Sequence, residues 1–222
     1  MKSLIRGFLG QKLAQASNLE APNFKYSYSQ FGEDIQIQRF VHGVRGLYLD
    51  IGSGHPIQGN NTYALYKDGW RGILVEPISE FAKLSKKLRP KDLFINGVMG
   101  AKPGRVDFYQ FEPYQYSTIL PSERDLRVSQ GIKLSNKFEV DVVTLKFILN
   151  LMPEYPHVIS IDAEGSDFVV LDEILTSQVL PLVFCIEDLQ PEETSKIHER
   201  LTNIGYYLVA RIYPSSIYVS KK

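Results

Sequence analysis

The stretch GLYLDIGSGHP (residues 46–56) begins with an almost continuous apolar segment, which is followed by an acidic residue and by two glycines with one residue between them. Such an apolar segment is typical of a strand that helices cover on both faces, as in a parallel sheet. Ligands of open α/β sheets bind beyond the carboxyl ends of the strands, and Asp50, Gly52 and Gly54 fall at such an end. The stretch therefore predicts an α/β fold with a ligand site at this turn.

Segments elsewhere in the chain repeat the alternation of strand and helix. RGILVEP (71–77), DLFINGVMG (92–100), HVISIDAEG (157–165) and LPLVFCIED (180–188) are further apolar strand patterns, and helical patterns separate several of them. YYLVARIYPSSIYVS (206–220) predicts a closing antiparallel hairpin at one sheet edge. We therefore expect a mostly parallel seven-stranded sheet with an antiparallel last strand.

A length of 222 residues predicts one main domain with a sizeable core. We expect a helical extension over residues 1–28 and the main domain over residues 29–222. Within residues 1–28, apolar residues fall on one helical face, at Leu4, Ile5, Phe8, Leu9 and Leu13. This face is expected to pack on the domain or to form a homodimer contact. The polar excursion 112–137 lies between two strand patterns and is expected to be a substrate lid or an insertion.

Composition excludes several classes of protein. Lys plus Arg and Asp plus Glu each number 25, so no net charge draws the chain to nucleic acid. No apolar run is long enough for a transmembrane helix. The single cysteine, Cys185, lies in an apolar strand pattern and excludes an internal disulfide, which favours a reducing compartment. We expect a cytoplasmic protein without a nucleic-acid partner.

The glycine spacing distinguishes between cofactors. The dinucleotide fingerprint needs a third glycine three residues after the second, and Ile57 occupies that position. The acidic Asp50 favours a cofactor with a cationic amino group over one with phosphates. Glu76 ends the next strand, where a carboxylate accepts hydrogen bonds from ribose hydroxyls, and Asn96 and Gly97 end the third. Together they predict an adenosine-bearing ligand, with simple turns as the alternative.

Two acidic pairs follow later strands at the same sheet edge. IDAEG places Asp162 and Glu164 after one strand, and CIED places Glu187 and Asp188 after another. Carboxylates gathered there repel one another unless a divalent cation or the hydroxyl donors of a substrate neutralise them. His55 directly follows the glycines and is the histidine best placed to abstract a proton. A role in fixing the loop is the alternative for this histidine.

The ordered set of motifs resembles the FkbM-type S-adenosylmethionine-dependent methyltransferases. The matching segments are SQFGED (29–34), GLYLDIGSGHP (46–56), NNTYALYKDGWRGILVEP (60–77), RPKDL (89–93), VDVVTL (140–145), ISIDAEGSDFVVL (159–171) and VFCIED (183–188). The family usually has Ala at the position of Ser53 and Ser at that of Asn60. The resemblance implies a Rossmann-like class I methyltransferase fold. It also implies methyl transfer to a hydroxyl, mostly of a sugar in a glycan or a glycosylated metabolite.

The residues and the resemblance together predict the roles of the site residues. S-adenosylmethionine is expected to bind Gln30, Asp50, Gly52, Gly54, Asn61, Glu76, Pro77, Asn96 and Gly97. Catalysis is expected to rest on His55, Asp162 and Glu164, with His55 or a carboxylate such as Glu164 as the base. The resemblance to magnesium-dependent sugar O-methyltransferases implies that Mg²⁺ or another divalent cation binds Asp162, Glu187 and Asp188. An NAD-dependent Rossmann oxidoreductase and a non-catalytic protein that binds cofactor or glycan are the alternatives.

Overall fold

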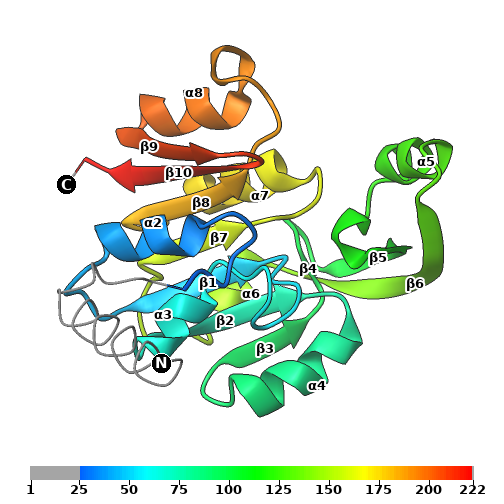
Figure 1. Ribbon diagram of the computed structural model, residues 1–222, viewed down its shortest axis with the longest axis horizontal. Helices are drawn as coiled ribbons and strands as arrows, with labels where there is room; N and C mark the ends of the chain where they lie inside the picture. The colour runs from blue at the N-terminus through cyan, green and yellow to red at the C-terminus, as the bar shows by residue number, and fades with distance from the viewer. Residues whose placement is uncertain (1–25, 222) are drawn as a thin grey trace, which may run out of the picture.

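The computed structural model describes residues 26–221, so the helical face predicted at residues 4–13, with its proposed dimer contact, lies outside the described residues. In the described part, seven strands form the main sheet in the order β3-β2-β1-β7-β8-β10-β9 (Figure 1). β10 alone runs in the direction opposite to the other six strands. The strands are β1 (Leu47–Ile51), β2 (Arg71–Glu76), β3 (Leu93–Asn96), β7 (Val158–Ile161), β8 (Val183–Glu187), β9 (Tyr206–Ile212) and β10 (Ser215–Ser220). The predicted Rossmann-like methyltransferase fold is confirmed.

Helices cover both faces of this sheet, which explains the continuous apolar run in β1. Leu49 and Ile51 pack with α6 (Leu145–Leu149), α7 (Asp167–Thr176) and α8 (Lys196–Asn203), which η2 (Glu192–Thr194) precedes. Tyr48 packs on the opposite face with α2 (Glu33–Phe40) and α3 (Tyr63–Lys67). Successive residues of a strand point to opposite faces, so a strand between two helical layers is apolar at most positions, and Asp50 is the exception in β1. α4 (Ser79–Leu88) packs beside β2 and β3.

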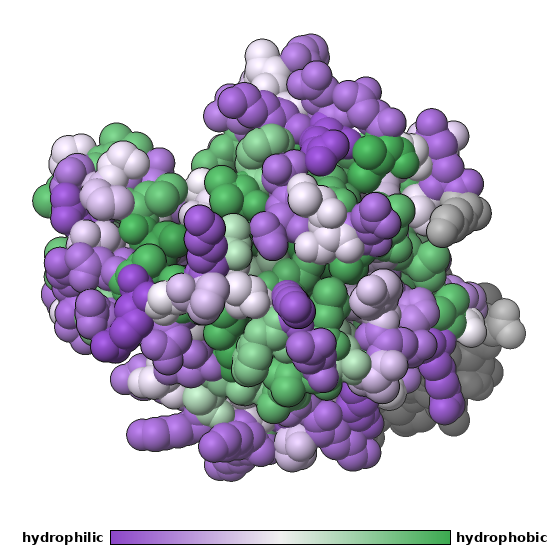
Figure 2. All heavy atoms as spheres, turned by 180° about the vertical axis from the view of Figure 1, so that it is seen from behind, coloured by the Kyte–Doolittle hydropathy of each residue, from purple (hydrophilic) through white to green (hydrophobic). Residues whose placement is uncertain are grey.

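A second sheet lies between β3 and α6 in the chain, and we call residues 98–143 the insertion. Its strands are β4 (Val98–Met99), β5 (Gly104–Glu112) and β6 (Lys133–Val143), in the order β4-β6-β5. The helices η1 (Tyr114–Tyr116) and α5 (Pro121–Ser129) connect β5 to β6. The predicted excursion 112–137 therefore contains two short helices and the first residues of β6. The insertion forms a lobe beside the main sheet, at the right in Figure 1 and at the left in Figure 2.

The segment DLFINGVMG, predicted as one strand, is divided at Gly97 into β3 and β4 of different sheets. A Cβ atom at this position would lie 2.6 Å from the carbonyl oxygen of Asp141 in β6. The chain therefore passes β6 at a distance that only glycine allows. This prediction was wrong because the crossing depends on β6, more than forty positions later in the sequence. None of the helices described in residues 26–221 is long and apolar enough to span a membrane.

Candidate active site

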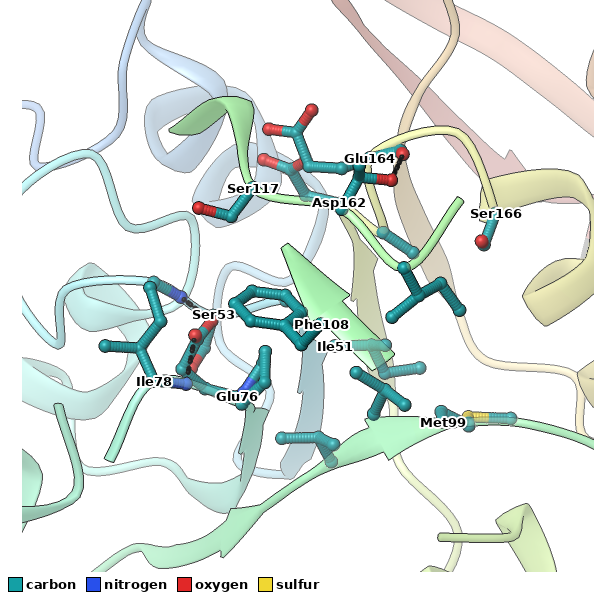
Figure 3. Close-up of a pocket in the computed structure, with 18 of the residues that line it drawn as sticks. Ile51, Ser53, Glu76, Ile78, Met99, Phe108, Ser117, Asp162, Glu164 and Ser166 are labelled. Carbon is teal, nitrogen blue, oxygen red and sulfur yellow. Dashed lines mark hydrogen bonds between the residues drawn. The ribbon is translucent and has the colours of Figure 1, made fainter. Parts of the chain in front are cut away.

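A cavity lies at the carboxyl ends of β1, β2 and β7, between the main sheet and the insertion (Figure 3). It holds about 990 Å³ of atom-free space, which includes the open solvent at its mouth. In Figure 3, Asp162 and Glu164 lie together on one side and Glu76 lies on the other, near Ser53 and Ile78. The cavity is thus at the sheet edge that the sequence predicted for the ligand.

The predicted site residues divide into two groups. Those that line the cavity are Gln30, Gly52, Gly54, Glu76, Pro77, Gly97, Asp162 and Glu164. Those that do not line it are Asp50, His55, Asn61, Asn96, Glu187 and Asp188. Asp50, His55, Asn61 and Asn96 bond to the loops and strand ends that carry the lining, Glu187 lies beside Asp162, and Asp188 holds the start of α8.

The glycine turn depends on a close approach between β1 and β7. Gly52 has a φ of +72°, and a Cβ atom there would lie 1.7 Å from the carbonyl oxygen of Asp162. The amides of Gly52 and Ser53 donate hydrogen bonds to the carbonyl oxygen of Val75 at 2.9 and 3.3 Å. Glycine is therefore required at position 52 both by backbone conformation and by space.

Glu76 fixes this turn from β2. Its Oε2 accepts a hydrogen bond from the Gly54 amide and its Oε1 accepts one from the Ile78 amide, each at 2.9 Å (dashed lines in Figure 3). Burial raises the pKa of Glu76 to about 7, although the two amides favour its charged form. The carboxylate still faces the cavity, so it joins the turn to the ligand space.

Asp50 faces away from the cavity, contrary to the expected direct contact with a cofactor. Because residues alternate along β1, Ile51 lines the cavity while the Asp50 side chain lies on the α3 side of the sheet. There Asp50 Oδ2 accepts hydrogen bonds from Thr62 Oγ1 at 2.6 Å and from Asn60 Nδ2 at 3.1 Å. Burial raises the pKa of Asp50, and the charge of Arg89 opposes this rise. Its position is that of a support for the turn.

Arg89 is the functional candidate that the sequence analysis missed. Its side chain is 0% exposed. The guanidinium donates hydrogen bonds to Asp92 Oδ2 at 2.7 Å, Asn60 Oδ1 at 2.9 Å, Tyr48 Oη at 2.7 Å and Thr62 Oγ1 at 3.0 Å. The segment RPKDL matches the family pattern, but the sequence does not indicate that its arginine is buried, because an arginine after an amphipathic helix usually lies at the surface. Asp92 three residues later was the available signal for a buried ion pair.

Asn61 and Asn96, both expected to bind the cofactor, contact protein groups instead. Asn61 Nδ2 donates to Ser160 Oγ of β7 at 3.1 Å. Asn96 Nδ2 donates to the carbonyl oxygens of Glu76 and Pro77 at 3.0 and 2.8 Å. These contacts join neighbouring strand ends, so both residues stabilise the edge on which the cavity is built.

His55 is placed to fix the loop. Its Nδ1 accepts hydrogen bonds from the Ile57 amide at 3.2 Å and the Gln58 amide at 3.0 Å. The neutral ring therefore carries its proton on Nε2, and this nitrogen cannot accept a second proton. Burial also lowers the pKa of His55. This geometry favours the loop-fixing role and leaves the carboxylates as candidates for the base.

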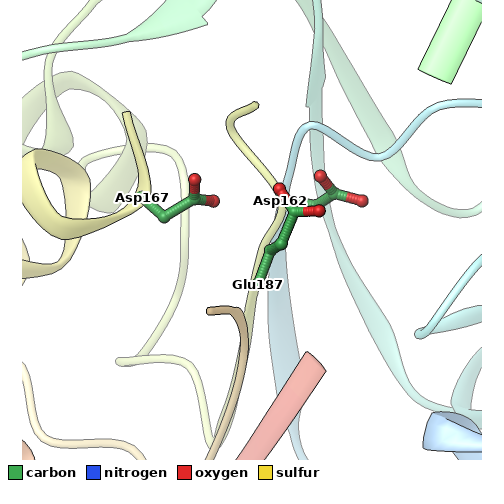
Figure 4. A group of neighbouring side chains, drawn as sticks. All are labelled: Asp162, Asp167 and Glu187. Carbon is green, nitrogen blue, oxygen red and sulfur yellow. The ribbon is translucent and has the colours of Figure 1, made fainter. Parts of the chain in front are cut away.

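Three carboxylates gather where β7 and β8 end. Asp162, Asp167 and Glu187 each present an oxygen within 4.8 Å of the others (Figure 4). Asp167 accepts hydrogen bonds from the Ala163 amide at 2.7 Å and the Gly165 amide at 3.0 Å, so it holds the loop before α7. Asp162 Oδ1 is buried and has no hydrogen-bond partner among the described residues. The free acceptor capacity of the group therefore lies with Asp162 and Glu187.

Asp188, expected as a metal ligand, is not part of this group. Its Oδ2 accepts a hydrogen bond from Ser195 Oγ and its Oδ1 accepts one from the Gln190 amide at 3.1 Å. Ser195 Oγ in turn accepts the His198 amide as the N-cap of α8. Asp188 thus anchors the start of α8, and the structure brings Asp167 into the carboxylate group instead.

Glu164 is held by the insertion from two directions. Its carbonyl oxygen accepts a hydrogen bond from Thr118 Oγ1, and its Oε2 accepts one from Arg127 Nη2, both at 3.0 Å. Its φ of +50° is rare for a residue other than glycine and is typical of functional sites. Burial and then the charge of Asp162 raise the pKa of Glu164 to about 9, while Arg127 opposes the rise.

The neighbouring carboxylates are shifted in the same direction. Burial, followed by the charge of Glu187, raises the pKa of Asp162 well above its ordinary value. Burial, followed by the charge of Glu164, raises the pKa of Glu187 to about 8. Titratable groups with strongly shifted pKa values that gather in one cavity are characteristic of functional sites. This site can take up a proton and can hold a positively charged ligand.

Comparison with known proteins agrees with this geometry. Neither the curated proteins nor the solved structures gave a match. A family model described as "Methyltransferase FkbM domain" matches residues 50–208, from the end of β1 into β9. The match covers more than half of the chain and includes every strand end that lines the cavity. The protein belongs to the FkbM family of methyltransferases.

Proposed function

We propose that the protein is an S-adenosylmethionine-dependent O-methyltransferase that acts on a hydroxyl group of a sugar, in a glycan or a glycosylated metabolite. The observation that carries the proposal is the position of Glu76. Its carboxylate holds the Gly54 amide and borders the cavity at the end of β2, where ribose hydroxyls are bound in related sheets. The cavity borders Gly52 and is lined by acidic residues. These features suit a positively charged adenosine derivative better than a dinucleotide, which carries negative phosphates.

The cofactor residues follow from this arrangement. We propose that Gly52, Gly54 and Gln30 border the methionine part, that Glu76 binds the ribose, and that Pro77 and Gly97 border the base. Asp50, Asn61 and Asn96 keep these residues in position through the hydrogen bonds described above. S-adenosylmethionine supplies an activated methyl group, and the cavity orients it toward the acceptor.

Glu164 is our candidate for the base, in preference to His55. It lines the cavity, and Arg127 and Thr118 fix its direction. In the empty cavity its pKa of about 9 means that it holds a proton at neutral pH. A positive charge that enters the cavity favours the carboxylate form, so Glu164 becomes able to take the proton of the acceptor hydroxyl. General-base assistance of this kind typically contributes about 10²–10⁴-fold to the rate.

We propose that the insertion forms a lid over the site where the acceptor binds. Tyr114, Gln115 and Ser117 line the cavity from it, within the segment 112–137. Tyr114 packs edge-on against Phe81, with ring centroids 4.9 Å apart. Aromatic faces and short polar groups are suited to sugar rings, which supports the choice of acceptor class.

The proposal does not require the divalent cation that the sequence suggested. Both oxygens of Asp167 already accept backbone amides, whereas Asp162 Oδ1 has no hydrogen-bond partner among the described residues, so Asp162 and Glu187 are the better candidates to hold an ion. Mg²⁺ is often held by one or two carboxylates with waters, and these two are the residues that would hold it. Activity that is lost on chelation and restored by Mg²⁺ would assign the pair to an ion.

The test has two parts. Calorimetry with S-adenosylhomocysteine should show binding, whereas NADH should not bind; the reverse result would support the oxidoreductase alternative. Incubation with S-adenosylmethionine and a panel of glycosides should then give a product with one added methyl group, detected by mass spectrometry. Cofactor binding without transfer to any member of a broad panel would support a non-catalytic role.

A further inference from the structure

Among the described residues, the cavity is lined by residues with carboxyl groups and by no basic residue. They are Glu76, Asp162 and Glu164, and no lysine, arginine or histidine of the described residues lines it. Glu187 and Asp167 each present an oxygen within 4.8 Å of Asp162 and add two further carboxyl groups. Two charges interact more strongly in a partly buried site of this kind than in open solvent, because the effective dielectric constant is lower.

Asp162 lies at the centre of this set. Its Oδ1 is buried without a hydrogen-bond partner in the described chain, which is unusual for a carboxylate because each unsatisfied group costs free energy. Its backbone carbonyl oxygen lies against Gly52 of the glycine turn. The unsatisfied carboxylate therefore lies beside the part of the cavity that we assign to the cofactor.

The nearest arginines are engaged elsewhere. Arg127 donates to Glu164 Oε2 at 3.0 Å, lies 3.7 Å from Glu123 Oε2 and also donates to the Tyr116 carbonyl oxygen. Arg89 lies in the polar network with Asp50, on the α3 side of β1, and pairs with Asp92 at 2.7 Å. Neither arginine contacts Asp162, so its Oδ1 is available to accept a contact from a ligand.

We infer that Asp162, assisted by Glu164, recognises the positive charge of the methyl donor, so that the site binds the charged donor more tightly than the uncharged product. The inference rests on the proposed function for the identity of the donor. Transfer breaks the sulfur–methyl bond, and its electron pair remains on sulfur, which becomes a neutral thioether. The acceptor oxygen forms the new bond to the methyl group, and its proton passes to a carboxylate. The loss of the positive charge then removes the attraction to Asp162 and favours product release.

Two stable probes test this inference without an acceptor. Sinefungin carries an ammonium group where the donor carries its charged methyl-bearing centre, and S-adenosylhomocysteine has the neutral sulfur. Calorimetry on the wild-type protein should show that sinefungin binds at least about tenfold more tightly, or about 1.4 kcal/mol. Asp162→Asn, which keeps the shape and removes the charge, should bring this ratio close to one. Glu164→Gln should reduce it by a smaller factor and serves as the second variant if Asp162→Asn does not fold.

The matched control is Asp172→Asn on α7, where a half-exposed carboxylate pairs with Arg200 outside the cavity. Its ratio should equal that of the wild type. Equal affinities of the wild type for both probes, or a ratio that Asp162→Asn leaves unchanged, would overturn the inference while leaving the proposed function intact. So would Mg²⁺ that binds the empty protein and abolishes the preference, because the ion would then be the partner of Asp162. Failure of both probes to bind would overturn the inference and the proposed function together.

Discussion

Arg89 Nη1 donates a hydrogen bond to Asn60 Oδ1 at 2.9 Å, and Asn60 in turn donates to the Asp50 carboxylate at 3.1 Å. This short chain of contacts connects the end of α4 to β1 beneath the glycine turn. A polar network inside an apolar fold is stable only when each member is satisfied, and rigidity follows when it is. The glycine turn beside the cavity is therefore held in place by residues that do not line the cavity themselves.

Replacing Arg89 should be strongly destabilising. Arg89→Met leaves the carboxylates of Asp92 and Asp50 without their buried cation, and breaking such a pair costs about 3–5 kcal/mol. The free energy of unfolding in urea measures this loss. Arg105→Met is the control, because Arg105 is 59% exposed and pairs with Glu139 in solvent. The control should change stability by about 1 kcal/mol or less, and an equal effect of both changes would contradict the role of the network.

Alanine substitutions at two glycines of the same loop should distinguish the cost of a steric clash from the cost of a positive φ. Gly52→Ala places a Cβ atom against the Asp162 carbonyl, whereas Gly59→Ala has open space at a similar φ of +66°. Gly59→Ala should therefore cost only the conformational term, about 1–2 kcal/mol. Gly52→Ala should prevent folding or abolish S-adenosylhomocysteine binding. Thermal melting followed by calorimetry measures both, and a Gly52→Ala protein that binds normally would disprove the close approach.

Glu76 should make stability depend on pH. Its pKa rises from 4.5 in the unfolded chain to about 7 in the fold, so the folded chain holds the proton more tightly. Its contribution to stability is therefore fully present below pH 4.5 and is lost as pH rises through about 7. Glu76→Gln cannot titrate, so the unfolding free energy of the wild type relative to this variant should fall across that window. A difference that is constant with pH would contradict the shift.

His55 and Glu164 should respond differently to substitution. His55→Asn retains a side-chain acceptor that can bond to nearby backbone amides, so cofactor affinity and methyl transfer should stay within about tenfold of the wild type. Glu164→Gln should retain S-adenosylhomocysteine binding but lower the rate of methyl transfer by about 10²–10⁴-fold. Rates are compared with an acceptor found in the glycoside panel. A large loss of rate in His55→Asn with unchanged cofactor binding would reassign the base.

The fold was predictable from sequence because its signals are local. The run in β1 is apolar at successive positions because helices lie on both faces, and the Gly52 turn follows it directly. The split at Gly97 was not predictable, since it depends on contact with Asp141 of a distant strand. Local patterns therefore defined the main sheet but not the second one.

The site was predictable in position but not in the direction of its side chains. Asp50 and Ile51 are neighbours in sequence, yet only Ile51 borders the cavity, because a strand turns successive residues to opposite faces. The roles of Asp167 and Asp188 could not be predicted from the sequence either. Asp188 anchors α8 and Asp167 joins the carboxylate group, and only the packing of the helix starts decides between them.

The strands at which the insertion begins and ends pair with each other. Val98 and Met99 of β4 lie beside Val142 and Val143 of β6, and the Gly100 amide donates to the Val143 carbonyl oxygen at 3.0 Å. This closure joins the two ends of the insertion, so the residues between them form a unit that is anchored at one place on the main sheet. Under the proposed function, replacing residues between these paired ends, other than the Thr118 and Arg127 that hold Glu164, should change the range of acceptors while the strands of the main sheet stay unchanged.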